Sequence, residues 1–388
     1  TLEGNTCEGN RWLGIAFFGH ATGTVRSNVC RNNGLHGIGG KGQAAPTLES
    51  NTCQGNEECG MLYRENAGGT AGNNVCRDNG HHGIDVQGQA APTLEGNTCE
   101  GNRWLGIAFL GHATGTVRNN VCRNNGLHGI AVRGKAAPML EGNTCEGNKE
   151  DGIAYSDKAG GTARDNVCRN NDVHGIEVQG QAAPTLEGNR CEANKYSGMA
   201  FFDNASGIGR NNVCRKNGLD GIALQGRATP TLEGNTCEGN KEDGIGYFDS
   251  AGGTARNNVC RSNGIGVLTA DHAAPTLDGN TCEGNRWLGI SFFGNATGTV
   301  RNNVCRNNGL DGIGVKGKAA PTLESNTCEG NLRYGIAYFE SAGGIATWNV
   351  CCGNREAQIW KGGSANPTLQ DNQEHTTKPD QLDRVRGL

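Results

Sequence analysis

Polar and apolar residues alternate in short stretches along the chain, and glycine or asparagine bounds each stretch. In Thr47-Leu48-Glu49 and in Thr52-Cys53-Gln54, an apolar residue stands between two polar ones. Alternation at a period of two residues is typical of a β-strand with one buried face, and glycine and asparagine are typical of turns. The pattern therefore predicts many short strands separated by tight turns.

The cysteines show that these stretches recur with a fixed period. They follow one another at steps of 23 residues, with one step of 22 between Cys260 and Cys282, and only Cys59 and Cys352 lie outside this column. The column comprises Cys7, Cys30, Cys53, Cys76, Cys99, Cys122, Cys145, Cys168, Cys191, Cys214, Cys237, Cys260, Cys282, Cys305, Cys328 and Cys351. This period is too short for a helical hairpin repeat, so each unit is one coil of a β-solenoid.

Two columns of asparagine accompany the cysteines. One begins at Asn10 and lies three residues after each cysteine, and the other begins at Asn5 and lies two residues before it. Asparagine tolerates the left-handed backbone of a sharp bend, and stacked amide side chains hydrogen-bond along a column. Asparagine at two fixed corners of every coil indicates that the coils stack in register.

The expected inner face alternates between large and small side chains. Odd coils carry an aromatic residue such as Phe17 or Tyr63 where even coils carry a residue such as Val86, and the sizes reverse across the coil. This arrangement fills the interior without overpacking it. The Arg11–Gly14 motif returns at 103–106 and 286–289, which indicates a 92-residue duplication. We expect an all-β, single-stranded parallel β-helix of about 16 coils over residues 1–372, with 373–388 as a cap or tail.

Two columns of charged residues alternate in sign from coil to coil. The column after the cysteines runs Glu8, Arg31, Gln54, Arg77, Glu100, Arg123, Glu146 and Arg169, and it continues in the same way. Opposite charges on neighbouring strands stabilise stacking modestly, whereas like charges oppose it. We therefore assign these columns a structural role, which removes their carboxylates from the catalytic candidates.

Net charge and hydropathy exclude some classes of partner. The net charge is −4, so no basic field exists to hold nucleic acid or an anionic membrane. No apolar run is long enough to span a bilayer. No signal peptide is visible, and Thr1 falls within a repeat, so the sequence leaves the localisation open. An uncapped first coil at Thr1 would also allow end-to-end self-association.

The cysteine and histidine columns do not predict a metal or cofactor. Neighbouring cysteines on in-register strands do not meet disulfide geometry, and no histidine shares their column, so we expect buried free thiols. His36, His82, His128 and His174 recur in alternate coils, with Asp220 and Asp311 at the same place. Residues two coils apart are separated by about 10 Å, which is too far for two of them to share a metal ion.

Outward-facing aromatic residues are the candidates for a binding surface. They are Trp12, Trp104, Trp287, Tyr196 and Tyr334. The tryptophans each follow an arginine at a predicted turn, and the tyrosines lie near the equivalent place. Exposed aromatic rows stack on sugar rings or contact a protein partner. The alternative is that these side chains only cover the edges of the coils.

The repeat units resemble those of a known superfamily. Residues 90–102 (AAPTLEGNTCEGN) and 119–130 (NNVCRNNGLHGI) resemble the parallel β-helix repeat of the pectin-lyase-like superfamily, and most closely its carbohydrate-binding and sugar-hydrolase type. The resemblance covers about residues 1–372 and implies a right-handed β-helix. The superfamily contains lyases, hydrolases, epimerases and non-catalytic modules. Its enzymes carry long loops and clustered acids, whereas this chain has equal coils and alternating charges, so no catalytic residue carries over.

Two functions remain open at this point. Uniform coils and neutral ladders favour a non-catalytic scaffold or binding module that presents a repeated surface to a polysaccharide or protein partner. The alternative is a polysaccharide lyase or glycoside hydrolase with a shallow groove on the side of Trp12, Trp104 and Trp287. That alternative requires acids outside the ladders to cluster, and its candidates are Asp151, Asp157, Asp243 and Asp249.

Overall fold

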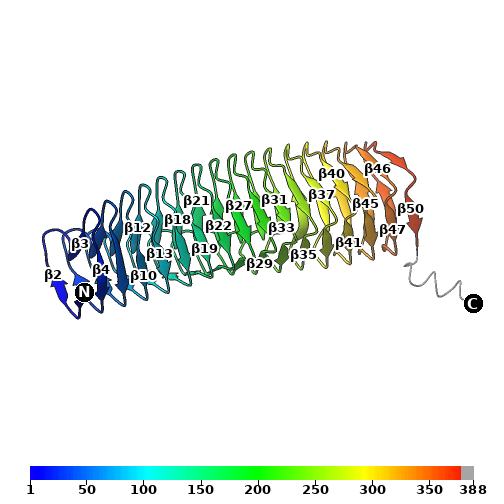
Figure 1. Cartoon of the computed structure of the whole chain (residues 1–388). Coiled ribbons are helices and arrows are strands. Elements are labelled where there is room, and N and C mark those ends of the chain that lie inside the picture. Colours follow the sequence, from blue (N-terminus) through cyan, green and yellow to red (C-terminus); the bar gives the residue numbers. More distant parts are fainter. Residues whose placement is uncertain (377–388) are drawn as a thin grey trace, which may run out of the picture. The chain divides into compact units, whose positions relative to one another are not determined.

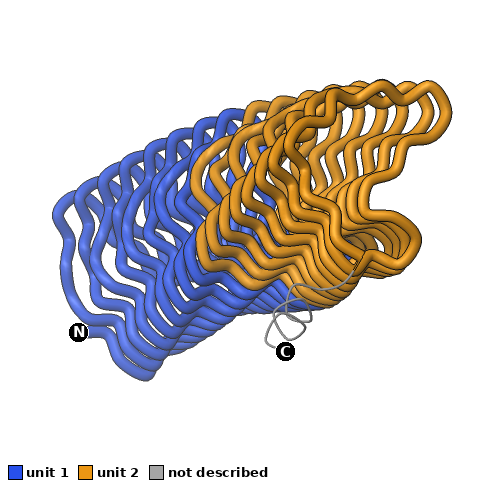
Figure 2. Tube along the Cα trace, turned by 90° about the vertical axis from the view of Figure 1, so that its right-hand side faces the viewer, with its two compact units in different colours: residues 1–196 blue, residues 197–388 orange. Residues whose placement is uncertain are grey.

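The computed structural model describes residues 1–376 and contains strands but no helix over that range. The chain divides into two compact units, residues 1–196 (unit 1) and residues 197–388 (unit 2), which Figure 2 colours blue and orange. Within each unit every full coil contributes one strand to each of three parallel sheets, which we name A, B and C (Figure 1). The described part of the chain includes no helix long and apolar enough to cross a membrane.

The strands of unit 1 are short, and most contain three residues. Sheet A contains β1 (Leu2–Glu3), β4 (Thr22–Arg26), β7 (Ala45–Glu49), β10 (Thr70–Gly72), β13 (Thr93–Glu95), β16 (Thr116–Arg118), β19 (Met139–Glu141), β22 (Thr162–Arg164) and β25 (Thr185–Glu187). Sheet B contains β2 (Thr6–Glu8), β5 (Val29–Arg31), β8 (Thr52–Gln54), β11 (Val75–Arg77), β14 (Thr98–Glu100), β17 (Val121–Arg123), β20 (Thr144–Glu146), β23 (Val167–Arg169) and β26 (Arg190–Glu192). Sheet C contains β3 (Ile15–Phe17), β6 (Ile38–Gly40), β9 (Met61–Tyr63), β12 (Ile84–Val86), β15 (Ile107–Phe109), β18 (Ile130–Val132), β21 (Ile153–Tyr155) and β24 (Ile176–Val178).

Unit 2 repeats this arrangement. Its sheet A contains β28 (Ile208–Arg210), β31 (Thr231–Glu233), β34 (Thr254–Arg256), β37 (Thr276–Asp278), β40 (Thr299–Arg301), β43 (Thr322–Glu324), β46 (Ile345–Thr347) and β49 (Thr368–Gln370). Its sheet B contains β29 (Val213–Arg215), β32 (Thr236–Glu238), β35 (Val259–Arg261), β38 (Thr281–Glu283), β41 (Val304–Arg306), β44 (Thr327–Glu329), β47 (Val350–Cys352) and β50 (Gln373–His375). Its sheet C contains β27 (Met199–Phe201), β30 (Ile222–Leu224), β33 (Asp243–Tyr247), β36 (Ile265–Thr269), β39 (Ile290–Phe292), β42 (Ile313–Val315), β45 (Tyr334–Tyr338) and β48 (Ala357–Lys361).

The strand register confirms the predicted β-helix of about 16 coils. Within unit 1, Cys76 of β11 pairs with Cys99 of β14, one 23-residue step away, and Leu94 of β13 pairs with Val117 of β16. The 22-residue step is taken up at the turn before β36, because Ile265 already pairs with Asp243. At the far end β50 pairs with β47, so residues 373–375 add a strand, and the rest of the predicted cap beyond residue 376 lies outside the described residues.

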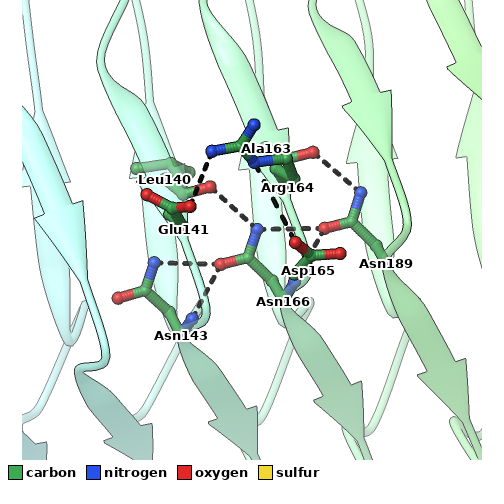
Figure 3. A network of polar contacts seen from close by, with 8 residues as sticks. All are labelled: Leu140, Glu141, Asn143, Ala163, Arg164, Asp165, Asn166 and Asn189. Atoms are coloured by element: carbon green, nitrogen blue, oxygen red, sulfur yellow. Dashed lines mark hydrogen bonds and ion pairs between the residues drawn. The ribbon is translucent and has the colours of Figure 1, made fainter.

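Asparagine side chains join each coil to the next, as the sequence predicts. The side-chain amide of Asn166 donates to Oδ1 of Asn189 at 2.9 Å and to the Leu140 carbonyl at 3.0 Å (Figure 3). Its Oδ1 accepts from both the backbone N–H and the side-chain amide of Asn143, each at 2.9 Å. The Asn166 side chain is fully buried, so the ladder satisfies polar groups that water cannot reach.

Large side chains in sheet C face small ones in sheet A, which confirms the predicted interior. Tyr155 and Phe109 are fully buried, and so are Ala163 and Val117 of sheet A. The hydroxyl oxygens of Tyr63 and Tyr155 are buried without a hydrogen-bond partner among the described residues. Packing of the rings, and not hydrogen bonding of the hydroxyls, therefore holds these tyrosines in place.

The cysteine column forms a stack of free thiols inside sheet B. All 18 cysteines are free, and all of them are buried except Cys7, which is half-buried. Burial raises the thiol pKa of Cys305 and of Cys328. A buried thiol packs as a small hydrophobic group and reacts slowly, so the stack is a structural element.

The alternating charges form ion pairs between coils. Arg164 lies 2.6 Å from Glu141 on sheet A, and Arg169 lies 2.9 Å from Glu146 on sheet B. These groups are close to half-exposed, so each pair adds little stability alone. Their alternation fixes the order of the coils, because two acidic coils or two basic coils in succession would place like charges side by side.

Candidate functional site

The outer face of sheet C carries the polar and aromatic groups that the ladders do not use. In β12, Ile84 and Val86 point into the core, and Asp85 between them is on the opposite face. The turn that leads into each strand of this sheet adds further side chains, such as His81 and His82 before β12. Side chains from neighbouring coils therefore gather on one face, about 4.8 Å apart.

In unit 1 this face is hollowed into a cleft of about 400 Å³. Its lining includes His36, Arg64, His82, Asp85, Gln87 and Trp104. The ring of His36 is fixed at both nitrogens, because Nδ1 accepts the backbone N–H of Cys59 at 3.2 Å and Nε2 lies 3.2 Å from the Glu58 carboxylate. The orientation of the histidine is therefore set before any ligand binds.

Trp104 forms one wall of this cleft. Its ring stacks on His81, with the centroids 4.3 Å apart and the planes 11° from parallel, and it meets His82 edge-on at 5.5 Å. The side chain is 42% exposed, so one face of the indole is covered by histidine and much of the rest is open to solvent. The sequence predicts Trp104 as a binding residue, and this geometry is suited to stacking.

Two buried polar groups in the cleft have spare hydrogen-bonding capacity. Nδ1 of His82 and Oδ1 of Asp85 have no hydrogen-bond partner within residues 1–376, although the two residues are only 8% and 4% exposed. Burial raises the pKa of Asp85 to about 6 and lowers the pKa of His82 to about 4. Unsatisfied buried polar atoms are costly, so they indicate a place where a ligand group can bind.

The same residue positions recur 92 residues later in unit 1. His128, Glu150, Asp151, His174, Glu177 and Tyr196 stand where His36, Glu58, Cys59, His82, Asp85 and Trp104 stand in the first copy. His128 again joins two neighbours, because Nε2 lies 3.1 Å from Glu150 and Nδ1 accepts the backbone N–H of Asp151 at 3.2 Å. Burial, with the charge of Asp151 next to it, raises the pKa of Glu177 to about 7.

Unit 2 has an aromatic cleft of about 550 Å³ on the outer face of its sheet C. Trp360, Phe339 and Phe293 line it. Tyr334 stacks on Trp360, with centroids 5.1 Å apart and planes 5° from parallel. The Arg333 guanidinium lies over Tyr334 at 5.0 Å, and it pairs with the carboxylate of Asp311, which is fully buried.

A pair of buried carboxyl groups lies elsewhere in unit 2. The backbone N–H of Asp243 donates to Oδ1 of Asp220 at 3.0 Å, and the two residues are 5% and 7% exposed. Burial raises the pKa of Asp220 to about 6. Burial and the nearby charge of Asp220 raise the pKa of Asp243 to about 8. Near neutral pH the pair therefore holds one carboxylic acid and one carboxylate.

The five predicted aromatic residues are all at least partly exposed. Trp104 lines the cleft of unit 1, and Tyr334 stacks on a tryptophan that lines the cleft of unit 2. Trp12 and Trp287 lie beside Arg11 and Arg286, with the guanidinium carbons 5.3 Å and 5.6 Å from the ring centres. Tyr196 lies near His174, with the rings 5.9 Å apart.

Within each unit, the two acids proposed for an enzyme lie in different surroundings. Asp157 and Asp249 lie at exposed turns with positive φ, where each accepts the backbone N–H of a glycine in the preceding coil at 2.9 Å. Asp151 and Asp243 are buried on sheet C and have other partners. Sequence reasoning missed Asp85, Glu177 and Trp360. A comparison of the chain with itself at an offset of 92 residues would have aligned the first two.

Comparison with known proteins gives a family and a set of distant structural neighbours. A family model described as the right handed beta helix region matches residues 1–144, 65–208, 128–282 and 263–378. No curated protein matches the sequence.

Solved structures with a similar fold include the mannuronan C-5 epimerase AlgE6 A-module of Azotobacter vinelandii, at 13% identity and a TM-score of 0.38 over 74% of this chain and 91% of that one. Pectate lyase Pel9A matches at 14% identity and a TM-score of 0.37, over 68% of this chain and 70% of that one. The periplasmic alginate epimerase AlgG matches at 11% identity and a TM-score of 0.37, over 85% of this chain and 76% of that one. Because the family model covers nearly the whole chain, the protein belongs to the right-handed β-helix family.

Proposed function

We propose that the protein is a glycan-binding β-helix that holds polysaccharide against the outer face of sheet C. The observation that carries this proposal is that each unit has an open cleft on that face with an aromatic wall beside charged groups. In unit 1 the wall is Trp104, and in unit 2 it is Trp360. Ligand sites combine such apolar surfaces with a few placed polar groups.

The chemistry of both clefts fits a sugar chain. The apolar face of a pyranose ring packs on an exposed aromatic ring, while its hydroxyl groups hydrogen-bond with carboxylates and guanidinium groups. Asp85 offers an unpaired oxygen next to Trp104, and Lys316 and Glu340 line the cleft of Trp360. These groups stand on successive coils, so the surface repeats in the direction in which a polymer would extend.

The test is a polysaccharide-panel binding experiment that also measures product release. We expect binding without cleavage, and we expect Trp360→Ala and Trp104→Ala each to weaken it about tenfold, which corresponds to ~1.4 kcal/mol. Trp348→Ala is the matched control, because Trp348 is 56% exposed but precedes β47 of sheet B. No binding to any glycan, or equal loss in all three variants, would overturn the proposal. Binding to a protein partner and to no glycan would also overturn the proposal.

A second candidate function is polysaccharide cleavage in unit 2. The pair of Asp220 and Asp243 favours it, because it supplies a protonated and an ionised carboxyl from adjacent coils, and general acid–base catalysis uses such groups. Both residues are more than nine-tenths buried, so a polysaccharide has little access to their carboxyl groups. For this reason we place cleavage second to glycan binding. Release of shorter glycans that stops in Asp243→Asn, with binding kept, would establish the enzyme instead.

A further inference from the structure

Three metal-binding groups converge on the outer face of sheet C in unit 1. Asp151, His174 and Glu177 each offer one ligand atom, and these atoms all lie within 4.8 Å of one another. Asp151 and His174 are 2% and 8% exposed, and Glu177 is half-buried. We propose that these three side chains bind a divalent transition-metal ion such as Zn²⁺ or Mn²⁺. This site is separate from the proposed glycan-binding function and does not depend on it.

The β-helix register creates the convergence. Asp151 stands in the turn before β21, and His174 stands at the equivalent place one coil later, before β24. Glu177 is the central residue of β24 and pairs in register with Ala154 of β21, so its side chain points outward on the same face. The register of two adjacent coils therefore brings the three side chains together on one face.

The set of donor groups indicates the class of metal. One imidazole nitrogen and two carboxylates suit zinc and manganese, whereas calcium prefers six to eight oxygen ligands. Three protein ligands also leave a coordination position open for water. A divalent cation would offset the repulsion between the Asp151 and Glu177 carboxylates, which the scaffold holds close together.

Groups around the ligands hold Asp151 in place. Its Oδ1 accepts the backbone N–H of His174 at 2.8 Å, and its own backbone N–H donates to Nδ1 of His128 at 3.2 Å. Nε2 of that histidine lies 3.1 Å from Glu150. Such outer contacts orient a ligand and are typical of metal sites in proteins.

The first copy of the 92-residue repeat supplies an independent observation. The positions of Asp151, His174 and Glu177 are occupied there by Cys59, His82 and Asp85, which are also metal-binding residue types. The Cys59 sulfur lies 3.9 Å from Oδ2 of Asp85. Nδ1 of His82 and Oδ1 of Asp85 are buried atoms without a hydrogen-bond partner in the described part of the chain, and both residues line the cleft. Donor atoms with free lone pairs thus occupy the equivalent place.

The test is titration of the chelator-treated full chain with Zn²⁺, followed by calorimetry, and with Co²⁺, followed by its visible absorption. We expect saturable binding that Ca²⁺ does not displace. We expect His174→Gln and Glu177→Gln each to weaken it at least about tenfold. Asp172→Asn is the control, because Asp172 is exposed and pairs with Lys149. Unchanged unfolding midpoints would show that the variants are folded.

The cobalt spectrum separates this site from the buried cysteines. Metal held by Asp151, His174 and Glu177 gives no sulfur-to-metal charge-transfer band, whereas metal held by Cys59 gives a band that Cys59→Ser removes. Absence of saturable binding would overturn the proposal. Binding that neither His174→Gln nor Glu177→Gln weakens would also overturn it, because the metal would then lie elsewhere.

Discussion

Removing one internal member of the asparagine ladder should cost far more stability than removing its first member. Asn166→Ala deletes four hydrogen bonds: two donated by the side chain, to Asn189 and Leu140, and two accepted from Asn143 (Figure 3). Each deleted bond contributes about 1 kcal/mol, and leaving the buried Asn143 N–H without an acceptor adds about 1–2 kcal/mol. We therefore expect a total loss of about 5 kcal/mol in the free energy of unfolding.

Asn5→Ala is the matched control, because Asn5 opens the same ladder but is exposed. Its side chain donates to Asn28 at 3.0 Å and to the Glu3 carbonyl at 3.1 Å, and water can replace both bonds. We expect a loss of at most about 1 kcal/mol there.

The assay is urea denaturation combined with hydrogen exchange of peptides around Asn143. In a solenoid each coil contacts only its neighbours, so Asn166→Ala should open the coils beside it before the rest unfolds. The Asn143 amide should lose most of its protection in this variant and keep it in Asn5→Ala. Equal denaturation midpoints for the two variants, with the Asn143 amide still protected, would refute the reasoning.

Three further predictions concern charge, pH and thiol chemistry. The pKa of Asp243 is raised to about 8 from 3.8 in the unfolded chain, so unit 2 should lose stability as the pH rises from about 4 to 8. Asp243→Asn should flatten this dependence in unfolding curves measured at pH 5 and pH 8, and an unchanged slope would contradict the assignment. Asp278→Asn should instead flatten the loss of stability on acidification below pH 3.8, because hydrogen bonds from Asn302 and Arg301 lower the pKa of Asp278 from that value. Glu146→Arg would stand between Arg123 and Arg169, so it should lower the denaturation midpoint more at low salt than at high salt, and more than Glu146→Gln does. A loss that is independent of salt would argue against the charge ladder. In the folded protein an alkylating reagent should modify Cys7 first, whereas denaturant should release all 18 thiols; mass spectrometry that finds rapid labelling of the column would disprove the buried stack.

The fold could be predicted from the sequence because every coil repeats the same requirements. Cysteine, asparagine and alternating charge recur at fixed positions, so a column such as Asn143, Asn166 and Asn189 can be read without any structure. The clefts could not be predicted in this way, because their residue types change from coil to coil. Trp360 stands in the last coil, where the pattern decays, and it pairs with Ala337, so its column gives no aromatic signal.

The acidic residues considered for catalysis show a second limit of sequence reasoning. In the sequence Asp151 stands as a single acid outside the ladders, but its neighbours His128 and Glu177 come from adjacent coils and lie 23 and 26 residues away in sequence. Only the register of sheet C brings such residues together. Periodicity predicts that register well, but the direction in which each side chain leaves the turn depends on local packing.

The alternation of odd and even coils also constrains how such a gene can change length. Recombination between near-identical repeats adds or removes whole coils. An event that shifts the array by one coil of 23 residues would place like charges beside each other in both charge columns, and would place side chains of the same size class beside each other in the core. An event of 46 residues preserves the sign and size of every neighbour. Viable descendants should therefore differ from this protein by even numbers of coils, because coils would be gained or lost two at a time.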